Sequence, residues 1–293
     1  MKQIIYIVFI TLITCLFIQG QDNKASVYVE TPKFTSQTFN NTRTIRILLP
    51  PGYHEQKNKK TSYPVLYLND GIMVFHAFKL EETVHRLINE KKVMPLIIVG
   101  IDNGGATDKT KNPVADRANE FLPYPDVGFA PDRLYEPNPP SPIGKLFPDF
   151  MVEVMSFIKE KYRIKSGTEN TGIGGFSYGG VAALYIAMNK SNMFGKLLLE
   201  STPLWIGKDK QLLKDTQKAK KWSAKIYIGL GTNENPDEVI NKEGKAEHDL
   251  LISSIRKNSP KSKIKNVLGE GDKHEPPAWS KRFPAALQFL FGN

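Results

Sequence analysis

The pentapeptide Gly-Phe-Ser-Tyr-Gly at residues 175–179 has the residue types and spacing of a nucleophile turn. Glycines on both sides of a serine allow a turn from strand to helix that is too tight for larger residues, and such a turn presents the hydroxyl at the edge of a sheet. An expected strand at 171–175 precedes the serine, and the small residues Gly180, Ala182 and Ala183, which open an expected helix, follow it. The pattern predicts that Ser177 is a nucleophile for acyl transfer.

A serine hydroxyl needs a base to accept its proton, and His274 is the best-placed histidine. It ends the short loop GEGDKH at 269–274, after the last expected strand, where the base emerges when the order along the chain is serine, acid and histidine. The other histidines precede the serine or fall in expected helices: His54, His76, His85 and His248. His248 lies beside Asp249, and we expect both side chains to face solvent.

The acid that orients the histidine is expected just after the strand that ends at Leu230. The segment GTNE at 231–234 places Glu234 first after the turn, and Asp237 is the second choice. A carboxylate at this place holds the imidazole in position and stabilises it once it is protonated.

An acyl-transfer site also needs two backbone N–H groups that stabilise the oxyanion. We expect one at Tyr178, the residue after the nucleophile. The other is expected at Ile72, because Gly71 allows the backbone to come close to a substrate.

Several segments, taken together, resemble a known family: YLNDG at 67–71, GGFSYGG at 174–180, GTNE at 231–234, and the glycine-rich loop that ends at His274 and is followed by Trp279. They are similar to the putative esterases, a family of α/β-hydrolases that includes enterobactin, feruloyl and acetylxylan esterases. The resemblance extends from about residue 43 to residue 291. It implies a serine carboxylic-ester hydrolase with Ser177, His274 and Glu234 as its triad.

Three further residues are candidates for substrate binding, namely Trp205, Asp70 and Arg117. The segment GIDN at 100–103 and the pattern R-x-x-E-F-x-P that begins at Arg117 resemble the enterobactin-esterase-like branch of the family. Trp205 is single where relatives often have a tryptophan pair, and it either lines a pocket or packs in the core. Arg117 either contacts substrate or pairs with Glu120 to fix the loop that carries both.

Apolar runs alternate with amphipathic segments along the chain, which predicts an α/β fold. From Val65 onward the runs are continuously apolar, as central parallel strands are when helices cover both faces. With the resemblance, this predicts an α/β-hydrolase fold with a mostly parallel central sheet of about eight strands and helices on both faces. The expected strands are 27–34, 43–49, 65–69, 96–101, 171–175, 196–200, 226–230 and 264–268, and the expected helices are 80–91, 147–162, 179–189, 208–218, 245–257 and 278–291.

Residues 1–20 have the pattern of a signal peptide, with Lys2, an apolar run at 4–18 and the small residue Gly20. The run is shorter than the roughly 20 residues that cross a bilayer. We therefore expect cleavage before Gln21, no stable membrane span afterwards, and a secreted or periplasmic protein. Cys15 offers a lipoprotein alternative, although its neighbours fit a lipidation site less well.

The rest of the chain is expected to form a lead-in strand at 21–42 and one catalytic domain at 43–293. Within that domain, residues 103–142 hold 8 of the 20 prolines and show no regular periodicity. Long irregular segments inside a compact domain are often functional, so this one is a candidate lid, and a plain surface insertion is the alternative.

Lysine and arginine outnumber aspartate and glutamate by 40 to 30, but the lysines are scattered, so no nucleic-acid partner is expected. The sequence has neither an H-E-x-x-H motif nor a complete dinucleotide loop, so no metal or cofactor is expected. The expected substrates are acyl or hydroxycinnamoyl carbohydrate esters, or a catecholate siderophore trilactone, which the positive charge slightly favours. An acyltransferase with the same triad and a non-catalytic binding protein are the alternatives, and the oligomeric state is left open.

Overall fold

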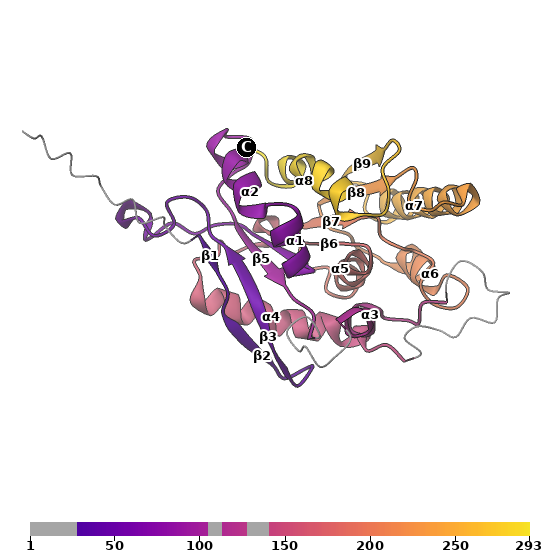
Figure 1. Ribbon diagram of the computed structural model, residues 1–293, viewed down its shortest axis with the longest axis horizontal. Helices are drawn as coiled ribbons and strands as arrows, with labels where there is room; N and C mark the ends of the chain where they lie inside the picture. The colour runs from indigo at the N-terminus through magenta and orange to yellow at the C-terminus, as the bar shows by residue number, and fades with distance from the viewer. Residues whose placement is uncertain (1–27, 105–112, 128–140) are drawn as a thin grey trace, which may run out of the picture.

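The computed structural model describes residues 28–104, 113–127 and 141–293, and Figure 1 shows a twisted sheet with helices on both sides. The described sheet has nine strands in the order β1-β3-β5-β4-β6-β7-β8-β9, with β2 also paired to β3. Strand β3 is antiparallel to its neighbours, and all other pairs are parallel. The predicted α/β-hydrolase fold is confirmed, with nine strands in place of about eight.

The strands are β1 (Val29–Glu30), β2 (Lys33–Ser36), β3 (Asn41–Leu48), β4 (Val65–Asn69), β5 (Ile97–Ile101), β6 (Thr171–Phe176), β7 (Lys196–Glu200), β8 (Lys225–Gly231) and β9 (Lys263–Gly269). The helices are α1 (Gly71–Ala77), α2 (Leu80–Asn89), α3 (Pro113–Phe121), α4 (Phe147–Lys161), α5 (Tyr178–Asn189), α6 (Gln211–Lys218), α7 (Glu238–Asn258) and α8 (Pro276–Phe291). Short 3-10 turns lie at Gln56–Asn58, Gly144–Leu146 and Thr168–Asn170.

The sheet separates two hydrophobic clusters, because side chains alternate between its faces. One cluster joins the sheet to α3, α4, α5, α6 and α7, and the other joins it to α1, α2 and α8. Strands β4, β5, β6 and β7 are buried along their whole length. Their burial on both faces explains the continuous apolar runs in the sequence.

Two helices were not expected from the sequence. Helix α3 lies inside the segment 103–142, so the prediction that this whole segment is irregular is wrong. Its first residue is Pro113, which a helix tolerates at a position whose N–H has no partner within the helix. Helix α1 begins at Gly71, directly after the left-handed Asp70. Residues 105–112 and 128–140 lie outside the described residues, so the lid stays a prediction.

The described part of the lead-in segment 21–42 contains β1 and β2, and both pair with β3. These residues therefore extend the sheet of the main domain. The expected signal peptide lies outside the described residues and stays a prediction. Within the part of the chain that the structure describes, no helix has the length and apolar character needed to span a membrane.

Parallel strands bring their carboxyl ends to the same edge of the sheet. Asp70 follows β4, Ser177 follows β6, Ser201 follows β7, and the loops after β8 and β9 carry Glu234 and His274. These five strands are consecutive neighbours in the sheet. The topology therefore gathers the candidate catalytic residues at one edge.

A buried ion pair fixes helix α3 to strand β3. The Nη1 and Nη2 atoms of Arg43 donate to Oε2 and Oε1 of Glu120 at 2.8 and 3.0 Å. The Arg43 side chain is fully buried, and that of Glu120 is 7% exposed. Glu120 is thus bound to β3, and the interpretation that Arg117 pairs with Glu120 is wrong.

We expect Arg43→Met to lower the free energy of unfolding by about 3 kcal/mol, because it leaves the Glu120 carboxylate buried without its cation. Adding Glu120→Gln should recover part of the loss, since no uncompensated charge then remains. Urea unfolding followed by circular dichroism measures both effects. The control is Lys57→Met, which breaks an exposed pair with Glu55 and should cost less than about 1 kcal/mol. A double variant no more stable than Arg43→Met would contradict this account.

Candidate active site

Ser177 occupies a strained turn between β6 and α5, with φ 55° and ψ −128°. A Cβ on Gly175 would collide with the carbonyl oxygen of Gly179, and a Cβ on Gly179 would come 2.5 Å from Oδ2 of Asp70. Both flanking positions are therefore restricted to glycine by close packing. The local sequence folds as predicted and presents the Ser177 hydroxyl at the carboxyl edge of the sheet.

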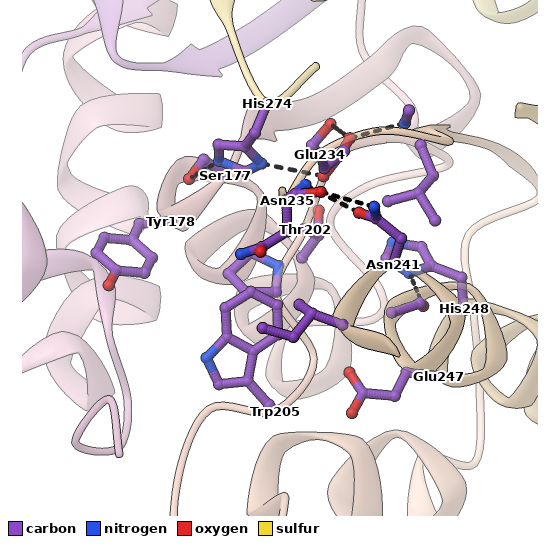
Figure 2. A pocket seen from close by; sticks show the side chains of 16 residues that line it. Ser177, Tyr178, Thr202, Trp205, Glu234, Asn235, Asn241, Glu247, His248 and His274 are labelled. Carbon is purple, nitrogen blue, oxygen red and sulfur yellow. Dashed lines mark hydrogen bonds and ion pairs between the residues drawn. The ribbon is translucent and has the colours of Figure 1, made fainter. Parts of the chain in front are cut away.

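Ser177, His274 and Glu234 form a continuous line of hydrogen bonds (Figure 2). His274 Nε2 lies 2.9 Å from Ser177 Oγ, and His274 Nδ1 lies 3.0 Å from Glu234 Oε2. An ionised carboxylate only accepts hydrogen bonds, so Nδ1 carries the proton and Nε2 is left to accept from the serine. This is the arrangement in which a histidine acts as base toward a serine.

The carboxylate of Glu234 is held by three donors. Besides His274, it accepts from the Ser201 hydroxyl and, at 2.7 Å, from the backbone N–H of Gly231. Burial alone would raise the pKa of Glu234, but these hydrogen bonds outweigh burial and lower the pKa below its ordinary value. Glu234 is therefore kept ionised beside the imidazole.

Asp237, the second choice for the acid, has a different place. Its exposed side chain caps helix α7, where Oδ1 accepts from the N–H of Val239 at 2.8 Å. A carboxylate at this position satisfies a free N–H and favours the positive end of the helix dipole. The structure thus brings Glu234, and not Asp237, to His274.

The two expected oxyanion donors differ in their surroundings. Tyr178 is the first residue of α5, directly after Ser177, so its N–H lies beside the Ser177 side chain, and its role as an oxyanion donor stays a prediction. The N–H of Ile72 donates to Oδ1 of Asp102 at 2.7 Å. Asp102 is buried and paired with Arg46 at 3.1 Å. In this structure the Ile72 N–H is bound to Asp102, and its role as an oxyanion donor stays a prediction.

Arg117 and Asp70 form a salt bridge with two hydrogen bonds near Ser177. Arg117 Nε donates to Asp70 Oδ1, and Nη2 donates to Oδ2 at 2.8 Å. Nη2 also donates to the carbonyl of Phe176, the residue before Ser177, at 3.3 Å. The pair thus fixes α3 against the strand that carries Ser177. It also lines the more open pocket at the site, so a substrate role for both residues stays a prediction.

Two cavities meet at Ser177 and His274. The more enclosed one has a volume of about 290 Å³ and lies between Thr202, Trp205 and helix α7. The more open one has about 530 Å³ and lies on the side of Arg117. Trp205 lines the first cavity, where its Nε1 donates to Asp126 at 3.2 Å. Of the two interpretations of Trp205, the structure supports the pocket wall.

His248 does not face solvent as expected. It is 5% exposed and lies in the wall of the enclosed cavity, on the inner face of α7. The expectation failed because packing against the rest of the domain sets the inner face of α7, and His248 lies on that face with Leu251, Ile252 and Ile255. The helix also begins at Glu238, earlier than the expected Lys245. Among the described residues, no group of three histidine, cysteine, aspartate or glutamate side chains could hold a metal ion.

A model of the Putative esterase family matches residues 36–290 of the chain. The chain belongs to this family. The esterase is 26% identical over 270 residues to the endo-1,4-beta-xylanase/feruloyl esterase of Xylanibacter ruminicola, an alignment that covers 88% of this chain and 30% of that protein. Family and relative together identify a carboxylic ester hydrolase.

Solved structures share the fold of the esterase. The siderophore hydrolase EstB from Aspergillus nidulans superposes with a TM-score of 0.71 at 18% identity, over 91% of this chain and 96% of that chain. The IroE-like serine hydrolase from Shewanella oneidensis superposes with a TM-score of 0.72 at 20% identity, over 90% of this chain and 80% of that chain. At these identities the likeness establishes the fold alone.

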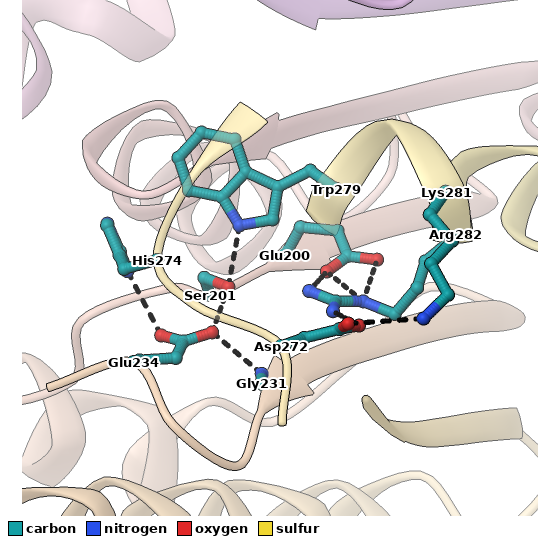
Figure 3. Close-up of polar contacts among 9 residues, drawn as sticks. All are labelled: Glu200, Ser201, Gly231, Glu234, Asp272, His274, Trp279, Lys281 and Arg282. Atoms are coloured by element: carbon teal, nitrogen blue, oxygen red, sulfur yellow. Dashed lines mark hydrogen bonds and ion pairs between the residues drawn. The ribbon is translucent and has the colours of Figure 1, made fainter. Parts of the chain in front are cut away.

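A buried charge network holds the loop that carries His274 (Figure 3). Arg282 of helix α8 donates to Glu200 Oε2 at 2.8 Å through Nη2, and to Asp272 through Nη1. Burial raises the pKa of Glu200 to about 7, and the Arg282 cation opposes that rise. Arg282 therefore ties the end of β7 to the histidine loop of the esterase.

Ser201 and Trp279 contact Glu234 and His274 and hold them in place. Trp279 Nε1 donates to Ser201 Oγ at 2.8 Å, and the Ser201 hydroxyl donates to Glu234. The Trp279 ring also meets the His274 ring edge to face at 5.2 Å. The sequence analysis missed Ser201 and Arg282. The available signal for Ser201 was its place directly after a predicted central strand, as for Ser177.

The lowered pKa of Glu234 predicts a pH-dependent stability difference between wild type and Glu234→Gln. The ionised carboxylate stabilises the fold above the ordinary pKa of 4.5, and this contribution is lost as the pH falls through the lower folded-state pKa. We expect Glu234→Gln to be less stable than wild type near neutral pH and the difference to shrink as the pH falls below 4.5. Urea unfolding across this range measures it, with the exposed Glu275→Gln as control. A difference that is independent of pH would contradict the assignment.

Proposed function

We propose that the esterase is a serine hydrolase that acts through Ser177, His274 and Glu234 and forms an acyl-enzyme. The observation that carries the proposal is the line of hydrogen bonds from Ser177 Oγ through both ring nitrogens of His274 to Glu234. The strained turn at Ser177 and the three donors on Glu234 support it, because they hold both side chains in position beside His274.

In this mechanism the Ser177 oxygen attacks the ester carbonyl while its proton passes to His274 Nε2. Glu234 stabilises the resulting imidazolium through Nδ1, and the N–H of Tyr178 stabilises the oxyanion. His274 then returns the proton to the leaving alcohol, and the acyl group remains on Ser177. A water molecule, deprotonated by the same histidine, releases the acid and restores the enzyme.

For the substrate, we propose acyl or hydroxycinnamoyl esters of carbohydrates or a catecholate siderophore trilactone. The feruloyl esterase relative supports the first class, and the fold shared with a siderophore hydrolase is compatible with the second. The two cavities that meet at Ser177 support an ester with sizeable groups on both sides of the scissile bond.

We expect Ser177→Ala to lower kcat/KM by at least about a thousandfold, because it removes the hydroxyl that is hydrogen-bonded to His274 Nε2. The panel consists of p-nitrophenyl acetate, methyl ferulate, acetylated xylan and a catecholate trilactone. A fluorophosphonate should add one adduct to Ser177 by mass spectrometry. Ser254→Ala, whose exposed hydroxyl bonds to its own helix, is the matched control. Retained hydrolysis by Ser177→Ala, or an adduct on another residue, would refute the mechanism.

We also propose that the protein is exported to the periplasm or the medium with residues 1–20 as its signal peptide. The apolar run at 4–18 and Gly20 support this. Mass spectrometry of the mature protein should find its first residue at Gln21. A lipid-modified amino terminus at Cys15, or retention of the apolar run, would be evidence against it.

A further inference from the structure

Unpartnered polar atoms gather in the wall of the enclosed cavity. Among the described residues, six have a buried side-chain nitrogen or oxygen without a hydrogen-bond partner, and three of the six, Thr202, Glu247 and His248, line this cavity. Buried polar groups are normally satisfied, because an unsatisfied one costs about 1–3 kcal/mol. Three such groups around one cavity beside a nucleophile indicate a place where a ligand supplies the missing partners.

Glu247 and His248 project from one face of helix α7. The cavity-lining positions of this helix are 240, 241, 244, 247 and 248, which follow the helical repeat. Figure 2 shows the Glu247 carboxylate pointing from α7 toward the side of the cavity where Trp205 lies. The Glu247 side chain is 4% exposed, so water outside the cavity does not satisfy it.

A glycine in the middle of the same helix leaves the cavity open. Gly244 lies on the lining face, and a Cβ added there would meet no atom within 4 Å. Glycine inside a helix costs about 1 kcal/mol relative to alanine, so its presence is unfavourable for the helix alone. At this position it provides room in front of Glu247 and His248.

The hydrogen-bond pattern makes these two side chains acceptors. His248 Nδ1 lies 2.8 Å from the carbonyl oxygen of Gly244, so Nδ1 carries the proton and Nε2 presents a lone pair. Burial lowers the pKa of His248, which keeps the ring neutral. Oε1 of Glu247 lies 2.7 Å from Lys210 Nζ, and Oε2 has no hydrogen-bond partner among the described residues.

We propose that the cavity between Trp205 and helix α7 is the subsite for an uncharged, hydroxyl-bearing part of the ester, whose O–H groups donate to Glu247 Oε2 and His248 Nε2. The inference rests on the proposed function and narrows it. Glu247 Oε2 and His248 Nε2 both present lone pairs and offer no donor to an anionic oxygen, so the subsite selects against an iron-loaded catecholate. The Trp205 ring provides a flat wall for a phenol or a sugar ring.

Matched ester pairs test the subsite. Burial raises the pKa of Glu247, so the assays are run at mildly alkaline pH, which favours the ionised carboxylate. The phenolic arm compares methyl 3,4-dihydroxycinnamate with methyl cinnamate, and the sugar arm compares an acetylated xylobiose with ethyl acetate. Wild type should prefer the hydroxylated ester in at least one arm, and that arm identifies the source of the hydroxyls. Glu247→Leu and Gly244→Val should lower the ratio of the two kcat/KM values about tenfold or more.

Two matched variants serve as controls, and melting temperatures verify that every variant is folded. Glu243→Leu removes a half-exposed carboxylate one turn away, outside the cavity lining, and should keep the wild-type ratio. Gly244→Ala adds one methyl group and should change the ratio less than Gly244→Val. An unchanged ratio in both Glu247→Leu and Gly244→Val, or no preference in wild type, would overturn the subsite.

A binding measurement separates this inference from the proposed mechanism. Calorimetry with the Ser177→Ala protein and methyl 3,4-dihydroxycinnamate should give weaker binding once Glu247→Leu is added. Binding that depends on Glu247 without hydrolysis by wild type would overturn the proposed mechanism and retain the subsite. Equal binding with and without Glu247, or tighter binding of an iron-loaded catecholate than of the neutral ester, would overturn the subsite even if hydrolysis depends on Ser177.

Discussion

The hydrogen bond between Ser177 Oγ and His274 Nε2 joins residues that are 97 positions apart and that follow strands β6 and β9. Strands β7 and β8 lie between them in the sheet, so the loop after β9 must reach back across two strands. The network around Arg282 and the edge-to-face contact between His274 and Trp279 direct the loop that way. These buried polar contacts therefore hold His274 at 2.9 Å from Ser177.

Three of the eight non-glycine residues with positive φ in the described part of the chain lie at the same edge. Asp70, Ser177 and Ser201, which directly follow β4, β6 and β7, have φ values of 61°, 55° and 47°. A non-glycine residue in such a conformation costs about 1–3 kcal/mol and persists only where its surroundings hold it. The salt bridge from Arg117 holds Asp70, and hydrogen bonds to Trp279 and Glu234 hold Ser201. Tertiary contacts thus stabilise turns that the local sequence would not form alone.

The sequence predicted the parts of the site that local patterns determine. Glycines around Ser177 indicate a tight turn, and a short loop after a predicted strand indicates Glu234 and His274, so the sheet and this line of residues were predictable. The partners of Arg117 lie far away in the sequence and depend on how the chain packs. The sequence around a charged side chain in a helix does not indicate which residue it pairs with. The buried face of α7 was missed for a related reason, since Glu247 and His248 resemble solvated residues in sequence.

Net charge says less about the ligand than the arrangement of charges does. The formal charge of +10 suggested an anionic substrate. Yet the arginines near the site are each neutralised by carboxylates: Arg46 by Asp102, Arg117 by Asp70, and Arg282 by Glu200 and Asp272. The positive charges of these arginines stabilise strands and loops through ion pairs, so they are not free to bind an anionic substrate. The open polar atoms of the enclosed cavity include the acceptors on Glu247 and His248, so hydrogen-bond donors on the substrate, rather than negative charge, match this side of the site.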